Sequence, residues 1–239
     1  MNRLFFRAYQ KTDQKAPENV VREAWKYDRF CAPKTAAKLA KVYLNSCLTN
    51  QTFTRVAEID GEPVGIIMGK EIQNHTCPVS LRIQWIQSVV SLYISQEGRE
   101  ISKIFACVQG VNRELLSSCN QAYKGEVTFF AIHEKCRGKG LGRKLFQTVV
   151  DYMKSRGISA FYLFTDTSCN YPFYEHLGLT RRCEKKQVVD VKGEQGEMTF
   201  FLYDYPREMG RSAFKRKAFC RIAIRHAALD KILKLRCCD

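Results

Sequence analysis

Residues 132–146 read IHEKCRGKGLGRKLF, and the prediction of the fold starts from this segment. Glycines alternate with other residues at Gly138, Gly140 and Gly142, and an apolar pattern follows them. Four-residue spacing predicts an amphipathic helix ending near Gly157, with the apolar positions Leu141, Leu145, Val149 and Met153. Because the first N–H groups of a helix are unpaired and carry partial positive charge, glycines placed there predict a cradle for an anion such as phosphate.

The elements on either side of this helix indicate an α/β fold. Continuous apolar runs at 125–132 and 159–165 predict buried strands, so strand, turn, helix and strand make a parallel βαβ unit. The dipeptide Asp60-Gly61 between two apolar runs predicts one hairpin, and a second hairpin is predicted to turn at 192–196. The sheet is therefore expected to be mixed and mainly antiparallel, around a parallel core.

Composition narrows the class of protein. The chain has 239 residues, 45% of them hydrophobic, which suits one sizeable globular domain with an appendage. There is no run of eighteen apolar residues, so no membrane span is expected, and Arg3 and Arg7 leave no room for a signal-peptide core. These features predict a cytoplasmic protein. The 11 cysteines lack a repeated CxxC pair, so reduced thiols and no metal site are expected.

The positive charge is concentrated at the C-terminus. The formal net charge is +15, and residues 206–239 hold ten basic and three acidic residues. Helical spacing predicts one apolar stripe in this tail, formed by Phe214, Ala218, Ile222, Leu229 and Leu233. Such a basic amphipathic helix fits contact with RNA, a membrane surface or a protein, and it equally fits packing on its own chain.

Two common phosphate motifs do not fit the glycines. The dinucleotide fingerprint needs GxGxxG, whereas the spacing here is GxGxG, and a Walker loop needs Lys-Ser/Thr where Arg143-Lys144 stands. The order of three other patterns is more specific: E-x-x-F-x-A-I at 126–132, Arg137-x-x-Gly140-x-Gly142 in the loop, and NYPFYEHLGL at 170–179. With these patterns, residues 3–204 resemble the GNAT superfamily of acyl-CoA-dependent N-acetyltransferases, most strongly from 125 to 180.

The resemblance implies a ligand and a set of contacts. In that family two central strands splay apart and acetyl-CoA binds at the gap, without metal, its pantetheine pairing with the first strand. The resemblance places pantetheine on Ala131, Ile132 and His133, with Asn170 bonding the same arm. It places the pyrophosphate on the amides of Arg137, Gly138, Lys139, Gly140, Leu141, Gly142 and Arg143.

The resemblance also implies catalytic roles. Glu126 is expected to take the proton of the amine, directly or through water, while the Ile132 amide holds the oxyanion. Tyr174 is expected to protonate the departing thiolate. Each role has a structural alternative: Glu126 as a solvated strand residue, Tyr174 as packing beneath the loop, Asn170 as a helix cap. An acyl-cysteine route through Cys136 is not expected, because the sequence offers no partner base.

The segment 71–123 exceeds the usual family connection, and spacing predicts two or three helices in it, at 81–94, 101–108 and 112–119. It is interpreted as a helical insertion in a catalytic domain spanning 1–205. One reading makes it a lid over the acceptor, lined by Trp85, Tyr93 and Phe105. The other reading makes it a helix pair that packs on the sheet. Two further helices are predicted before the first hairpin, at 17–28 and 32–48.

The resulting prediction is an N-acetyltransferase that moves acetyl from acetyl-CoA directly to a primary amine. Transfer of a longer acyl group stays open, as does a homodimer, which is common in folds of this type. Two other classes stay open: an acyl-CoA-binding module without catalysis, and a nucleic-acid-associated protein acting through its basic tail.

Overall fold

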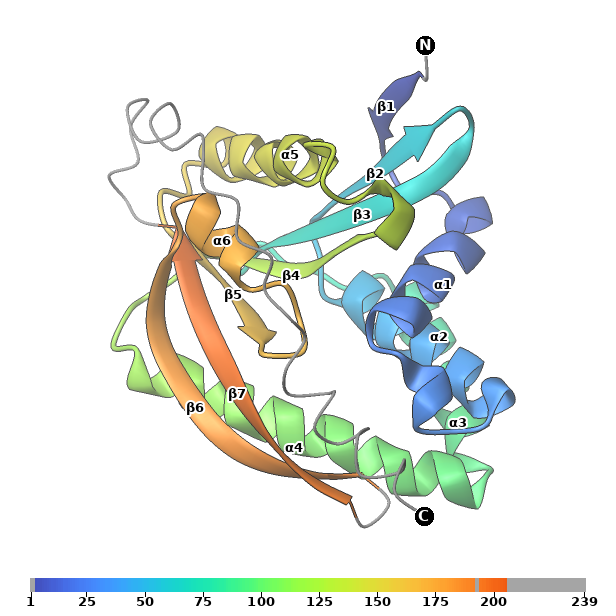
Figure 1. Cartoon of the computed structure of the whole chain (residues 1–239). Helices are drawn as coiled ribbons and strands as arrows, with labels where there is room; N and C mark the ends of the chain where they lie inside the picture. Colours follow the sequence, from blue (N-terminus) through green and yellow to red (C-terminus); the bar gives the residue numbers. More distant parts are fainter. Residues whose placement is uncertain (1–2, 192–193, 206–239) are drawn as a thin grey trace. The chain divides into compact units, whose positions relative to one another are not determined.

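The computed structural model describes residues 3–191 and 194–205, so the predicted C-terminal helix lies outside the described residues (Figure 1). Its strands are β1 (Leu4–Arg7), β2 (Phe53–Ile59), β3 (Glu62–Glu71), β4 (Gly125–Ile132), β5 (Phe161–Asp166), β6 (Thr180–Val191) and β7 (Glu194–Tyr205). Its α-helices are α1 (Lys15–Ala24), α2 (Pro33–Thr49), α3 (Val79–Tyr93), α4 (Gln96–Ser118), α5 (Leu141–Ser155) and α6 (Pro172–His176). Short 3-10 helices are η1 (Lys11–Asp13), η2 (Tyr27–Arg29) and η3 (Glu134–Cys136).

The predicted α/β fold with a mixed sheet is confirmed. The strand order in the described chain is β1-β2-β3-β4-β5-β7-β6, mostly antiparallel, with β4 and β5 parallel. By contact, the chain divides into two compact units, Met1–Arg99 with Tyr123–Phe161, and Glu100–Ala122 with the residues from Tyr162 onward.

In the first unit, α5 lies against β3 at unusually short range. A Cβ added to Gly69 would lie 2.6 Å from Cγ2 of Val149, and one added to Gly65 would lie 3.3 Å from Cδ2 of Leu145. These two glycines of β3 therefore let the helix approach the sheet more closely than any side chain would permit. The buried side of α5 carries the predicted apolar stripe, Leu141, Leu145, Phe146, Val149, Val150 and Met153. This packing fixes where the helix begins, and with it the position of the glycine loop.

The β2–β3 hairpin turns where the sequence predicts. Asp60 and Gly61 have φ values of 52° and 89°, the left-handed pair that a two-residue hairpin turn requires. The second hairpin is tighter than predicted. The predicted turn at 192–196 is wrong at its C-terminal end, because Glu194 already pairs with Val191 and Gly196 pairs with Val189.

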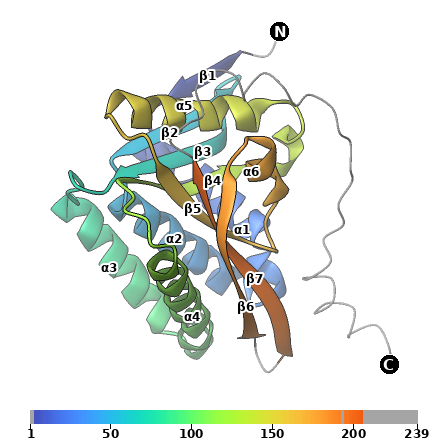
Figure 2. The ribbon, with the colours of Figure 1, turned by 90° about the vertical axis from the view of Figure 1, so that its left-hand side faces the viewer.

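On the sheet face opposite α5, α1 and α2 cover the strands, and α3 packs on α2 (Figures 1 and 2). The Nζ of Lys38 on α2 donates to the carbonyl of Ser91 at 2.6 Å, and Asn45 donates to the carbonyl of Gln84 at 3.5 Å. Bonds from α2 side chains to α3 carbonyls thus hold the inner side of α3 in place.

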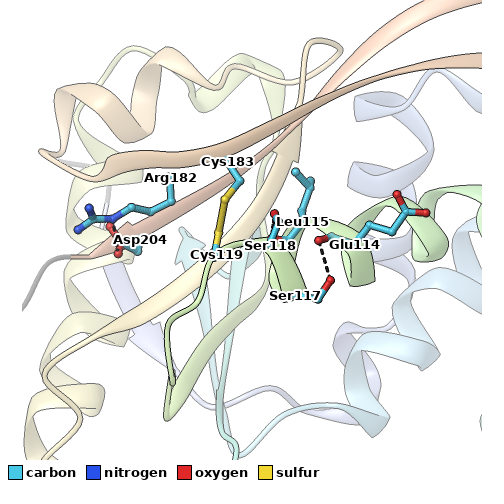
Figure 3. Close-up of a disulfide and its surroundings, with 8 residues drawn as sticks. All are labelled: Glu114, Leu115, Ser117, Ser118, Cys119, Arg182, Cys183 and Asp204. Carbon is cyan, nitrogen blue, oxygen red and sulfur yellow. Dashed lines mark hydrogen bonds and ion pairs between the residues drawn. A yellow bond between two sulfur atoms is a disulfide. The ribbon is translucent and has the colours of Figure 1, made fainter.

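The second unit joins α4 to the β6–β7 hairpin. The end of α4 is linked to β6 by a disulfide between Cys119 and Cys183, whose Cα atoms lie 6.4 Å apart (Figure 3). Beside it, Nε of Arg182 donates to Oδ2 of Asp204 at 2.7 Å (Figure 3). The expectation that the thiols are reduced is therefore wrong for this pair. The two cysteines lie 64 residues apart in sequence, so no short cysteine spacing predicts the disulfide.

The segment between β3 and β4 forms two helices, α3 and α4. The stretches 101–108 and 112–119, predicted from separate patterns, form one helix that continues through Gly110. A glycine inside a helix costs only about 1 kcal/mol relative to alanine, which the packing of a 23-residue helix overcomes.

Candidate active site

The glycine loop leads from β4 into α5 through left-handed backbone. Gly138 and Gly140 both have φ of 77°, and Gly140 is the N-cap residue of α5. A Cβ added to either glycine would meet nothing within 4 Å, so space does not explain the glycines. Backbone conformation does, because a residue with a Cβ is strained at this φ. Gly142 lies inside the first turn of α5 and is not left-handed.

The start of α5 is arranged for an anion. Within the described chain, no side chain caps this helix start and its first turn contains no acidic residue, although caps and acids are favoured there. The cationic side chains around it are exposed, and they are Arg137, Lys139, Arg143 and Lys144. Nε of Arg137 donates to the carbonyl of Ile132 at 3.2 Å, which ties the loop back to the end of β4. These features fit a pyrophosphate at the positions that the sequence predicts.

The end of β4 presents backbone amides on two edges. Ala131 and Ile132 pair with Ile66 and Gly65 of β3, and the amide of His133 donates to the carbonyl of Val64 at 2.8 Å. Successive amides along a strand point to opposite edges. Since the His133 amide points toward β3, the Ile132 amide points to the other edge, where an extended pantetheine arm would pair.

The His133 side chain has a structural role in the loop. Its Nδ1 accepts from the amide of Lys135 at 3.3 Å, which caps η3. Its Nε2 lies 3.6 Å from Oε2 of Glu23 on α1, an ion pair when the imidazole is protonated. The ring therefore supports the loop and faces α1, which agrees with a loop role rather than with a catalytic base.

Glu126 lies near the beginning of β4, half-buried, beside the buried thiol of Cys47. Burial raises the pKa of Cys47 to about 12, and the negative charge of Glu126 contributes to that shift. The Cys47 Sγ lies 4.0 Å from the carbonyl of Thr128. Because Cys47 belongs to α2, the carboxylate lies on the face of the sheet that α1 and α2 cover. A register shift opposite Met68 and Gly69 leaves Thr128 as an extra residue, a β-bulge in the middle of this strand.

An aromatic cluster lies on the same face, and the sequence patterns did not single it out. Trp25, Tyr43 and Phe129 have ring centroids 5.0, 5.7 and 6.3 Å apart, pair by pair. Phe129 is buried, whereas Trp25 and Tyr43 are half-buried. Trp25 caps the C-terminus of α1, Tyr43 belongs to α2 and Phe129 belongs to β4. Trp25 and Tyr43 lie in the two helices predicted at 17–28 and 32–48, which was the available signal.

In the second unit, Tyr174 lies on α6 and its hydroxyl stays protonated over a wide pH range. Burial raises the pKa of Tyr174 well above its usual value, and the nearby acidic groups Cys169 and Asp166 add to the shift. Burial also raises the pKa of Asp166, whose Oδ1 accepts from the amide of Ser168 at 2.7 Å. Asn170 is exposed in the turn before α6, and its carbonyl accepts from the amide of Phe173 at 3.2 Å. The backbone of Asn170 is thus hydrogen-bonded to the first turn of α6.

The predicted site residues are therefore distributed over both units. The first unit brings together the strand end, the loop and the start of α5, with Glu126 farther back on β4. Asn170 and Tyr174 belong to the second unit. Of the three residues proposed to line a lid, Trp85 and Phe105 are half-buried, whereas Tyr93 is 48% exposed on α3, which does not fit a pocket wall. Among the described residues, no three His, Cys, Asp or Glu side chains gather as a metal site requires, and no helix could span a membrane.

A strand that runs through a glycine loop into an acid-free helix start is an arrangement suited to a phosphate-bearing ligand. The family model described as Acetyltransferase (GNAT) family matches residues 18–179, and the chain belongs to this family. The resemblance to the GNAT superfamily is thereby confirmed. The chain is a GNAT N-acetyltransferase, an acyltransferase of class EC 2.3.1, and acetyl-CoA is the typical acyl donor of this family.

Solved structures share the fold at low sequence identity. An N-acetyltransferase from Staphylococcus aureus Mu50 is 11% identical with a TM-score of 0.51, covering 86% of this chain and 99% of that one. The protein smu.2055 from Streptococcus mutans UA159 is 15% identical with a TM-score of 0.51, covering 85% and 99%. The protein SsHAT is 18% identical with a TM-score of 0.52, covering 83% and 96%. None of the curated proteins compared with the chain matches it.

Proposed function

We propose that this enzyme transfers an acetyl group from acetyl-CoA directly to a primary amine, without a metal or a covalent enzyme intermediate. The observation that carries the proposal is the loop between β4 and α5, where two left-handed glycines lead into a helix start without acids or a side-chain cap. Acetyl-CoA supplies the acetyl group as a thioester. The chain supplies amides for the phosphates and for the pantetheine arm, in the positions predicted from sequence.

The carbonyl oxygen needs a hydrogen-bond donor at the edge of β4 that faces away from β3. The amide of Ile132 points to that edge, and so does the amide of Phe130 two residues earlier in the same register. Glu126 lies six residues before Ile132, which corresponds to about 20 Å along a strand. Phe130 is closer to Glu126 than Ile132 is, so we assign the oxyanion to the Phe130 amide as well as to Ile132. Glu126 then takes the ammonium proton of the acceptor through water.

Tyr174 supplies the proton for the departing sulfur. Its raised pKa keeps the hydroxyl protonated at neutral pH, so the group is in the form that donates. Asn170 is proposed to bond the pantetheine arm, and its exposed position allows this. A direct route also leaves the thiol of Cys136 without a chemical role.

The acceptor is proposed to enter from the face covered by α1 and α2. Glu126, Trp25 and Tyr43 all lie on that face, and aromatic rings beside a carboxylate favour an organic ammonium ion. The net charge of +15 disfavours a polycationic acceptor. We therefore favour a monoamine with an apolar or aromatic body.

The test starts with calorimetric titration of the full chain with acetyl-CoA and with desulfo-CoA. Micromolar binding of both is expected, because the phosphates and pantetheine make the proposed contacts. Monoamines with aromatic and with short polar bodies are then compared by release of free thiol, with the corresponding alcohols as controls. Absence of binding at millimolar ligand, or thiol release that no amine increases, would contradict the proposal.

A further inference from the structure

The outer side of α3 is an apolar surface that the described chain leaves open to solvent. Of the nine large hydrophobic side chains exposed among the described residues, six belong to α3 or follow directly after it. These six form what we name the α3 face, and they are Val79, Ile83, Ile86, Val90, Tyr93 and Ile94, each 48–74% exposed. From Val79 to Tyr93 their spacing is four, three, four and three residues, and Ile94 follows directly, so they make one stripe along the helix. The other side of α3 packs on α2 (Figure 2).

We propose that the α3 face is the interface through which two copies of this chain form a dimer. Side chains of this size expose about 150–200 Å² each when free, so their exposed fractions correspond to about 600 Å² per copy. Two copies would bury about 1,200 Å², which exceeds the roughly 1,000 Å² expected of a biological interface. A single exposed apolar patch of about 600 Å² is at the upper end for a monomer.

Charge favours a second copy over the basic tail as the occupant. The 15 residues of α3 contain one charged residue, Arg82, so the face resembles an interface core, where charges are depleted. Residues 206–239 carry ten basic and three acidic groups, and α3 offers them no carboxylate. Lys38 and Lys41 of α2 border the groove beside α3 and would repel such a tail. A neutral stripe pairs best with an identical neutral stripe.

The spacing also indicates an orientation for the pair. Intervals of four, three, four and three residues from Val79 to Tyr93 match the seam of a coiled coil. In an antiparallel pair with its two-fold axis level with Ser88, Ile86 faces Val90 of the second copy and Ile83 faces Tyr93 of the second copy. The two Arg82 side chains then lie at opposite ends, whereas a parallel pair would place them side by side.

The test is the mass of the full chain in solution. Sedimentation velocity between about 1 and 100 µM should show a dimer that dissociates on dilution. Interfaces of this small area are typical of weak, transient association. Ile86→Glu places two carboxylates in the centre of the interface and should raise the dissociation constant at least about 100-fold. Val188→Glu is the matched control, since Val188 is 52% exposed on β6. Ile86 is 48% exposed, so Ile86→Glu should keep the thermal midpoint of the monomer.

A charge-pair experiment tests the orientation independently of folding. Ile83→Lys and Tyr93→Glu should each be monomeric alone, and an equimolar mixture should regain dimers because the new lysine and glutamate face each other across the axis. A full chain that is monomeric at 100 µM would overturn the proposal and would assign the face to another occupant, the tail first. Dimers that survive Ile86→Glu, or monomers that the mixture does not rescue, would overturn the interface or its antiparallel orientation.

Discussion

Replacing Gly140 by alanine tests whether left-handed backbone, rather than space, makes the anion cradle. The φ of 77° at Gly140 is the conformation in which a Cβ costs about 1–2 kcal/mol. No atom lies within 4 Å of the added Cβ, so the substitution introduces strain without a clash. Arg137, Lys139 and Gly140 are exposed, so little packing opposes a change of the loop. We therefore expect the loop of the variant to relax to another conformation in the free protein. Binding must then restore the left-handed conformation, which makes the free energy of binding less favourable.

The expected result is an affinity loss. A penalty of about 1–2 kcal/mol corresponds to a 5- to 30-fold increase in the dissociation constant of desulfo-CoA. Isothermal titration calorimetry measures this directly, because desulfo-CoA carries the phosphates but cannot react. The thermal midpoint should stay near the wild-type value, since the strain is released in the free protein.

Two glycines of the same chain serve as matched controls. Gly61 has φ of 89° and open space around its Cβ, but it lies in the β2–β3 turn. Gly61→Ala should lower the thermal midpoint by a few degrees and leave the dissociation constant unchanged. Gly110→Ala, inside α4, should raise the midpoint slightly because alanine favours helix. A dissociation constant for Gly140→Ala within twofold of wild type would refute the cradle reasoning.

Three further predictions concern catalysis and stability. Tyr174→Phe should lower kcat about 100-fold while the affinity for desulfo-CoA stays constant, and full activity would return the tyrosine to a packing role. Asp13 is buried, which alone would raise its pKa, but two hydrogen bonds from Arg7 lower it overall. Because the pKa of Asp13 is lower in the folded state than in the unfolded state, its ionised carboxylate stabilises the fold at pH values above the unfolded-state pKa. This stabilisation is lost as the pH falls through the folded-state pKa. Asp13→Asn should therefore cost about 2 kcal/mol in urea unfolding at pH 7 and progressively less below about pH 4, and a pH-independent cost would contradict this. Cys119→Ser opens the 64-residue loop closed by the disulfide and should cost up to about 4 kcal/mol, against no change for the free thiol variant Cys77→Ser. Equal unfolding curves for wild type and Cys119→Ser under oxidising conditions would show that the disulfide does not stabilise the fold.

The glycine loop could be predicted from sequence because it is encoded by neighbouring residues. Strand, glycines and helix follow one another between 125 and 155, and both the loop conformation and the helix stripe are local properties. The hairpin at Asp60 and Gly61 is local in the same way. Sequence reasoning identified these elements correctly, and the range matched by the family model, residues 18–179, includes them.

The features missed from sequence depend on contacts between distant residues. The rings of Trp25, Tyr43 and Phe129 come from three separate segments of the chain, and no spacing in the sequence predicts their contact. The disulfide of Cys119 and Cys183 is non-local for the same reason. Helical periodicity locates α3, but it does not tell which of its sides is buried, because both sides carry apolar residues.

That last ambiguity explains why two readings of α3 stayed open, and the composition of the helix bears on the choice. A helix buried on one side normally alternates apolar and charged faces, yet α3 has one charge in 15 residues. Its inner side needs polar groups, since Ser88 is buried and α3 carbonyls accept bonds from Lys38 and Asn45 of α2. Its outer side is apolar as well, where a helix that faces solvent usually carries charges. This missing charged face makes sense if the outer side is itself an interior, which is what pairing with a second copy would make it.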